Sequence, residues 1–169
     1  MRQVVYSVAA SLDGYISGPN GESDWIVMDP EIDFSAIFAR FDTFLLGRKT
    51  YEATRGSGGG MSGAKSYVFS TTLQQDDCPG VTVSDDPAGT VTTLKQQPGK
   101  DIWLFGGGEL FASLLGLGLV DTVEVAIIPV ILGGGVSFSY DMPSRAELRL
   151  VEHRIYPTTG TVALTYTTS

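Results

Sequence analysis

Hydrophobic and polar positions change their spacing several times along the first two-thirds of the chain. The run QVVYSVAA at 3–10 is almost continuously apolar, which is typical of a buried strand. Residues 30–41 instead carry an apolar stripe at helical spacing, with Asp29 as the expected N-cap and Pro30 as the first helical residue. The pattern also predicts strands at 43–47, 66–70, 81–86 and 101–105, and helices at 48–54, 87–97 and 109–116.

From residue 120 onward the pattern is strand-like. Residues 120–132 have a strand-like pattern throughout, interrupted at Pro129, and residues 161–167 alternate cleanly. Residues 146–156 alternate with a slip near Leu150 and Val151, which predicts a β-bulge. These patterns together predict a single α/β domain over 1–169. We expect a mostly parallel central sheet of about eight strands, with an antiparallel C-terminal edge and helices on both faces.

Composition and charge narrow the range of partners. The 169 residues are 43% hydrophobic and 18% charged, which is typical of a globular protein. A formal net charge of −8 argues against binding to nucleic acids or acidic membranes. No apolar run approaches the roughly 18 residues of a membrane helix, so we expect a cytoplasmic protein. The single Cys78 allows no internal disulfide, and the lone His153 gives no histidine-based metal site, so no metal is expected.

Two predicted strands end in glycine immediately before a predicted helix. In the first, FLL leads to Gly47 and then to Arg48 and Lys49; in the second, WLF leads to three glycines and Glu109. Helix N-termini attract anions, and glycine lets the backbone approach them. Each corner alone could be a tight turn or a solvated helix start, and neither matches a Rossmann or P-loop motif. Two such corners in one chain favour a dinucleotide with two phosphate contacts.

Four segments resemble known reductases. LLGRKTYE and LFGGGELFASLL are similar to the strand–helix segments of dihydrofolate reductase. SLDGYISGPNGESDWI and VDTVEVAIIPVILGGG resemble the reductase domain of the riboflavin-biosynthesis deaminase–reductase. The chain is therefore identified as dihydrofolate-reductase-like, of the RibD C-terminal type, with no deaminase domain. The resemblance implies an NADPH-dependent reductase of a small-molecule substrate, and a homodimer formed through the apolar strands after residue 120.

The resemblance also implies roles for individual residues. Ala9 and Ile16 would border the nicotinamide, and Asp13 and Gly14 would shape the loop over it. The phosphates and the adenosine end of NADPH would be held by residues after three strands, with Arg48 near the 2′-phosphate. These residues are Gly47, Arg48, Lys49 and Thr50; Ser70, Thr71 and Thr72; and Gly106, Gly107, Gly108, Glu109 and Leu110.

The resemblance leaves alternatives for the residues that would contact the substrate. Glu31 or Asp33 would be the acid that serves the substrate, although either could simply favour a helix N-terminus. Trp25 would line the substrate pocket, or be a structural aromatic residue. We expect a reductase acting on a small heterocyclic or ribosylamino substrate, similar to 5-amino-6-(5-phosphoribosylamino)uracil reductase. The alternatives are a true dihydrofolate reductase and a non-catalytic nucleotide-binding protein on the same fold.

Overall fold

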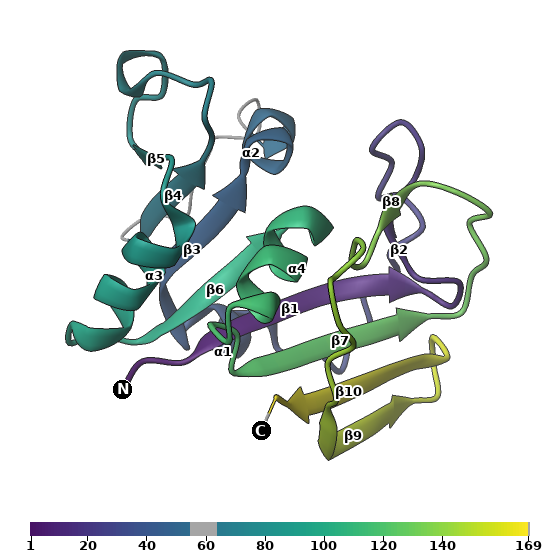
Figure 1. The fold of residues 1–169 in the computed structure, drawn as a ribbon. Helices are drawn as coiled ribbons and strands as arrows, with labels where there is room; N and C mark the ends of the chain where they lie inside the picture. The colour runs from purple at the N-terminus through teal and green to yellow at the C-terminus, as the bar shows by residue number, and fades with distance from the viewer. Residues whose placement is uncertain (55–63, 169) are drawn as a thin grey trace.

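The computed structural model describes residues 1–54 and 64–168 and contains one large sheet (Figure 1). Its eight strands run in the order β5-β4-β3-β6-β1-β7-β10-β9. A second sheet contains the two short strands β2 and β8. The strands are β1 Val4–Ser11, β2 Tyr15–Ser17, β3 Phe41–Gly47, β4 Lys65–Phe69, β5 Thr82–Ser84, β6 Asp101–Gly106, β7 Thr122–Ile128, β8 Val136–Ser137, β9 Arg149–Tyr156 and β10 Thr161–Thr167.

Strand directions in the large sheet follow the expected pattern. The six strands from β5 to β7 pair in parallel, and β10 pairs antiparallel with both β7 and β9. The register of β9 against β10 shifts between Thr165 and Tyr166, so that Val151 has no partner in the ladder. This shift confirms the predicted bulge. The sheet itself confirms the predicted α/β class with its antiparallel C-terminal edge.

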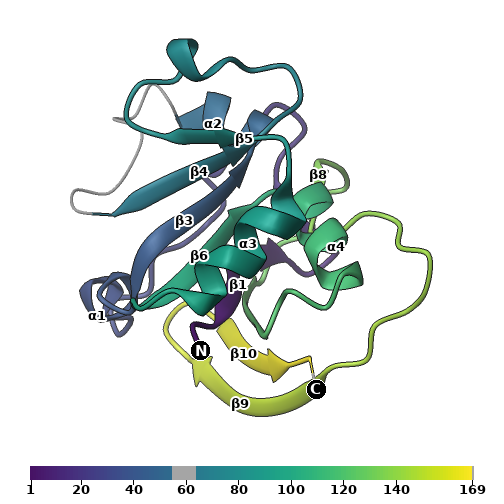
Figure 2. The same ribbon diagram turned by 60° about the vertical axis from the view of Figure 1, so that its left-hand side comes forward.

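Helices cover both faces of the sheet (Figure 2). They are α1 Phe34–Phe38, α2 Arg48–Thr54, α3 Pro87–Gln96 and α4 Gly108–Gly116, with a short 3-10 turn at Gln75–Asp77. Side chains alternate along β1, so Tyr6 packs with Phe111 of α4 while Val5 joins the opposite core with Trp103 and α1. Within the described residues no helix is long and apolar enough to cross a membrane.

The helix expected at 30–41 is much shorter than the sequence pattern predicted. It begins at Phe34, and Asp33 caps it by accepting a hydrogen bond from the backbone N–H of Ala36 at 3.1 Å. The predicted N-cap Asp29 is buried and bonded elsewhere, so the predictions of Asp29 as cap and Pro30 as first residue are wrong. Its carboxylate accepts from the Thr159 hydroxyl at 2.6 Å, which lowers the pKa of Asp29 and ties this loop to the β9–β10 turn.

Ion pairs gather at the edge of the sheet where the parallel strands begin. The buried guanidinium of Arg2 pairs with Asp42 and donates to the Thr43 hydroxyl at 2.7 Å. Lys95 and Asp121 form a second pair at 2.5 Å. These pairs fix the amino-terminal ends of the strands, and the carboxyl ends lie at the opposite edge.

Candidate functional site

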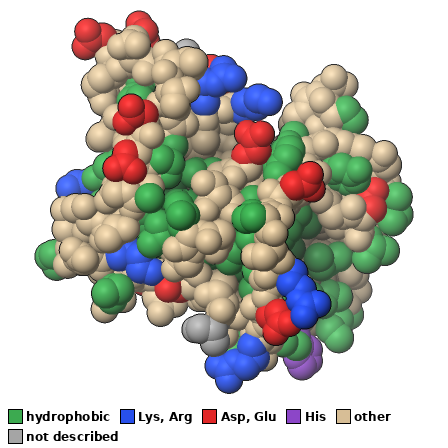
Figure 3. Space-filling view, viewed as in Figure 1, with side chains coloured by type: hydrophobic (Ala, Val, Ile, Leu, Met, Phe, Trp, Pro, Cys, Tyr) green, Lys and Arg blue, Asp and Glu red, His purple; other side chains and the backbone are tan. Residues whose placement is uncertain are grey.

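A pocket of about 1170 Å³ lies at the carboxyl ends of β1, β3, β4 and β6. Parallel α/β sheets commonly bind ligands at this edge. The surface is hollowed here between two parts of the molecule, and basic side chains gather on the wall over α2 (Figure 3). Predicted cofactor residues that line the pocket are Ala9, Ile16, Gly47, Arg48, Lys49, Thr50, Ser70, Thr71, Thr72, Gly107, Gly108, Glu109 and Leu110.

The two glycine corners lie next to each other. Strands β3 and β6 are neighbours, and Leu46 stands opposite Gly106 in their register. A Cβ atom added to Gly47 would lie 3.7 Å from both the carbonyl oxygen of Gly106 and the nitrogen of Gly107. The hydroxyl of Thr50 lies alongside, 3.5 Å from a Cβ built on Gly107. The corners therefore form one continuous surface of backbone, where a single ligand can contact both.

The start of α4 presents backbone N–H groups to this surface. Gly107 is the N-cap, and no side chain in the described part of the chain caps it. The N–H groups of the first turn have no partner within the helix, and their residues Gly108, Glu109 and Leu110 line the pocket. Gly108 packs against the β8 segment so closely that a Cβ would lie 2.4 Å from the carbonyl oxygen of Ser137. The peptide bond between Gly106 and Gly107 is cis.

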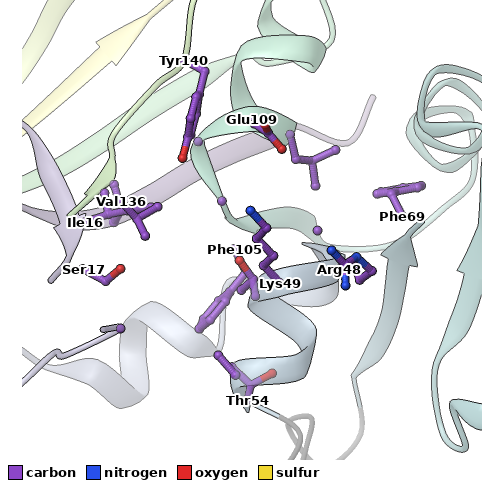
Figure 4. A pocket seen from close by; sticks show the side chains of 18 of the residues that line it. Ile16, Ser17, Arg48, Lys49, Thr54, Phe69, Phe105, Glu109, Val136 and Tyr140 are labelled. Atoms are coloured by element: carbon purple, nitrogen blue, oxygen red, sulfur yellow. The ribbon is translucent and has the colours of Figure 1, made fainter. Parts of the chain in front are cut away.

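Two cations follow the first corner and point in different directions (Figure 4). Lys49 extends toward the start of α4, while Arg48 points to the side of the pocket where Phe69 lies. Arg48 pairs with Glu52 at 3.2 Å, one helical turn away, and both side chains are 42% exposed. Such an exposed pair contributes little stability and is easily exchanged for a ligand anion.

The loop after β4 closes the far end of the pocket. The Ser70 hydroxyl accepts hydrogen bonds from the backbone N–H groups of Thr72 and Leu73, at 3.1 and 3.0 Å. These bonds fix the loop and leave Thr71 exposed at the rim. Asp85, which follows β5, also lines the pocket, and it was not among the predicted residues.

The opposite wall is built by β2, β8 and the segment after β8. Ile16, Val136 and Tyr140 line it. The wall is attached to the core because the buried hydroxyl of Tyr6 donates to the carbonyl oxygen of Phe138 at 2.8 Å. Burial raises the pKa of Tyr6, so this phenol stays protonated and keeps its hydrogen bond.

Asp13 and Gly14 do not line the pocket themselves. The Asp13 carboxylate accepts from the Ser11 hydroxyl at 2.6 Å and from the backbone N–H of Gly133 at 2.8 Å. The Ser11 bond and the backbone bonds lower the pKa of Asp13. Asp13 therefore joins the β1–β2 turn to the segment after β7, and it acts on the pocket through the position of β2.

The predicted substrate residues lie outside the pocket. Glu31 and Asp33 are exposed, and Asp33 caps α1. Trp25 donates its indole N–H to the carbonyl oxygen of Glu22 at 2.9 Å, which orders a loop that does reach the pocket through Ser23 and Ile26. Gly106 adjoins the pocket through its peptide bond but does not line it.

Several lining residues were missed by the sequence reasoning. They are Ser7, Val8, Ser17, Gly21, Ser23, Ile26, Ala53, Thr54, Phe69, Asp85, Pro87, Trp103, Phe105, Val136 and Tyr140. Phe105 had a usable signal, because it is the last side chain of β6 before the second corner. Val136 and Tyr140 had none, since β8 is two residues long and its position depends on pairing with β2.

Comparison with known families identifies the chain. The family model of the RibD C-terminal domain matches residues 2–162. The chain belongs to the RibD C-terminal domain family. The chain is also similar to the uncharacterized protein YyaP of Bacillus subtilis (strain 168), with 35% identity over 178 residues. That alignment covers 98% of this chain and 94% of YyaP.

Solved structures of low sequence identity share the fold. A putative riboflavin biosynthesis protein from Shewanella sp. PV-4 superposes with a TM-score of 0.83 at 23% identity, covering 100% of this chain and 99% of that one. A Thermotoga maritima diaminohydroxyphosphoribosylaminopyrimidine deaminase/5-amino-6-(5-phosphoribosylamino)uracil reductase gives 0.71 at 19% identity, covering 99% of this chain and 57% of that one. Dihydrofolate reductase from Enterococcus faecalis, complexed with NADP(H), gives 0.71 at 16%, covering 98% and 95%. The fold is dihydrofolate-reductase-like.

Proposed function

We propose that this protein is an NADPH-dependent reductase that transfers a hydride to a small heterocyclic or ribosylamino substrate. One observation carries the proposal: Gly47 and Gly107 bring two helix starts together at one pocket. A dinucleotide diphosphate fits this arrangement, because it needs backbone donors and close approach over several ångströms. The structural similarity to a dihydrofolate reductase complexed with NADP(H) supports the choice of cofactor.

Each part of the pocket has a role in this proposal. The amides at the start of α4 and the Lys49 ammonium hold the diphosphate, and Arg48 with the loop at Thr71 holds the adenosine phosphate. Ala9 and Ile16 confine the nicotinamide. When bound, the reduced nicotinamide supplies the hydride, so this chain has to align the substrate and exclude water.

Titration with NADPH and with NADH, read by quenching of tryptophan fluorescence, tests the proposal. Trp103 lines the pocket and reports on its occupancy. Replacing Arg48 with alanine removes a charge-assisted bond to the 2′-phosphate, which is worth about 1.5–3 kcal/mol, so NADPH binding weakens while NADH binding does not. Arg145→Ala is the matched control, since Arg145 is an exposed arginine with its own acidic partner, Glu147. Equal losses for both nucleotides in Arg48→Ala contradict the 2′-phosphate assignment.

We also propose a homodimer that forms through the edge strand β9, acting in the cytoplasm. Residues 149–155 are exposed on both faces of this strand, and Ile155 is 62% exposed. If the β9 strands of two copies paired antiparallel with the two-fold axis at His153, Glu152 of each copy would lie opposite Arg154 of the other. Val151 of each copy would likewise lie opposite Ile155 of the other. This pairing complements both charge and apolar surface.

Sedimentation equilibrium tests the dimer, and cell fractionation tests the location. The wild-type chain is expected at twice its own mass. Ile155→Glu is expected to sediment as a monomer because it places a charge in the apolar pairing. Ile131→Glu, at an exposed isoleucine that is not part of β9, should stay dimeric. A monomeric wild type, or a dimer that survives Ile155→Glu, contradicts this interface.

A further inference from the structure

Tyr140 joins the β8 side of the pocket to the start of α4. It is 45% exposed and lines the pocket together with Gly107, Gly108 and Glu109. A Cβ atom built on Gly108 would lie 3.1 Å from Cδ2 of Tyr140, so the tyrosine ring packs directly on the backbone at the first residue of α4. Any larger side chain at position 108 would compete with the ring for this space.

The segment that carries Tyr140 is held in place by contacts with the core. The Tyr6 hydroxyl donates to the carbonyl oxygen of Phe138 at 2.8 Å, and the Phe138 ring packs edge-on against Phe111 of α4, with ring centroids 5.4 Å apart. The Ser139 hydroxyl donates to the carbonyl oxygen of Tyr140 at 3.3 Å. The backbone at Tyr140 is therefore positioned before a ligand binds, which lowers the entropic cost of binding.

The Tyr140 ring also stands between two cavities. A second cavity of about 530 Å³ runs along α4, where Ser113, Leu117 and Pro143 line it. Glu109 and Tyr140 belong to the walls of both cavities. Because nearly half of its side chain is open to solvent, core packing alone does not account for a tyrosine at this position.

The hydroxyl of Tyr140 faces the corner proposed for the diphosphate. Figure 4 shows the hydroxyl end of Tyr140 and the amino end of Lys49 both turned toward the start of α4, with Ile16 and Val136 on the same wall as the tyrosine. A phenol is a neutral donor, and its hydrogen bond to a phosphate oxygen is charge-assisted. In the proposed binding mode Ile16 confines the nicotinamide and Arg48 holds the adenosine phosphate, so Tyr140 lies on the nicotinamide side of the diphosphate.

We infer that Tyr140 is a cofactor-binding residue whose hydroxyl donates a hydrogen bond to the nicotinamide-side phosphate of the dinucleotide. This inference rests on the proposed reductase function and adds a contact from the segment after β8, far along the chain from both glycine corners. NADPH and NADH share this phosphate, so Tyr140 supports the binding of both nucleotides, whereas Arg48 distinguishes between them.

Calorimetric titration of Tyr140→Phe with three nucleotides tests the inference. The variant keeps the ring on Gly108 and removes only the hydroxyl. The nucleotides are NADPH, NADH and adenosine 2′,5′-bisphosphate, which carries the adenosine-side phosphate but not the nicotinamide-side one. NADPH and NADH should each bind about tenfold or more weakly than to the wild type, by equal factors, because both lose one charge-assisted hydrogen bond. Adenosine 2′,5′-bisphosphate should bind to the variant and the wild type equally.

Other results of these titrations overturn the inference. Unchanged NADPH binding by Tyr140→Phe shows that the hydroxyl makes no contact with the cofactor, and a loss limited to NADPH moves its contact to the 2′-phosphate. An equal loss for adenosine 2′,5′-bisphosphate indicates a disturbed fold or an adenosine-side contact. Tyr166→Phe, at a half-buried tyrosine on β10 outside the pocket, is the matched control and should change none of the three affinities. A wild-type chain that binds neither dinucleotide contradicts the proposed function itself, whereas wild-type affinity in Tyr140→Phe contradicts this inference alone.

Discussion

Replacing Gly47 with alanine separates folding from cofactor binding at the paired glycine corners. The added methyl group would lie 3.7 Å from the Gly106 carbonyl oxygen and the Gly107 nitrogen, an ordinary van der Waals distance. Gly47 also has no left-handed backbone conformation that alanine would strain. The free energy of unfolding should therefore change by less than about 0.5 kcal/mol, as for substitutions that create no clash or cavity.

In the proposed binding mode, the same methyl group stands where the diphosphate of NADPH approaches both corners. Loss of one charge-assisted hydrogen bond costs about 1.5–3 kcal/mol, so NADPH should bind about tenfold to a hundredfold more weakly to Gly47→Ala. Stability is measured by urea unfolding and affinity by tryptophan quenching. NADPH affinity within twofold of wild type, at unchanged stability, would refute the reasoning.

Two other glycines give the contrast that this experiment needs. Gly108→Ala forces a Cβ to within 2.4 Å of the Ser137 carbonyl oxygen, so the backbone has to move and stability should fall by about 1–3 kcal/mol. Gly134→Ala meets nothing within 4 Å and should be neutral in both assays. The three variants together distinguish a blocked site from a disturbed fold.

Other predictions address single residues. Asp29→Asn should lower Tm at neutral pH, because the hydrogen bond from Thr159 lowers the pKa of Asp29 and so stabilises the folded state. This stabilisation is present above the ordinary carboxyl pKa and is lost as the pH falls, so the Tm values of the two proteins should converge in acid. A Tm difference that stays constant with pH would contradict this. Asp85→Asn should tighten NADPH about twofold to fivefold by removing a negative charge from the adenosine end, and weaker binding in the same titration would contradict it. Glu31→Gln and Asp33→Asn should each change kcat less than twofold, since neither side chain lines the pocket. A tenfold or greater loss of kcat in either variant would instead support its predicted role as the acid that serves the substrate.

The sequence predicted the fold well where a local pattern decides it. The strand patterns, the glycines at strand ends and the slip in β9 are all readable from neighbouring residues, and the structure confirms them. The glycine corners belong to this class, because a strand followed by glycine and a helix start is a local signal. Their adjacency then follows from β3 and β6 being neighbours.

Long-range contacts explain what the sequence did not predict. Asp29 was expected to cap a helix, but Thr159, far along the chain, binds its carboxylate, and the helix starts later at Asp33. The pocket wall at Val136 depends on a two-residue strand that pairs with β2. The exposure of Phe105 could not be predicted either, because in the sequence it resembles any other apolar residue of a strand.

A crystal structure of the protein grown with NADPH tests the central claim most directly. The account predicts that the diphosphate lies within hydrogen-bonding distance of the backbone nitrogens of Gly108 and Glu109 and of the Thr50 hydroxyl, with Lys49 beside it. A diphosphate bound elsewhere, or a fully loaded crystal in which both glycine corners contact no part of the nucleotide, would contradict it.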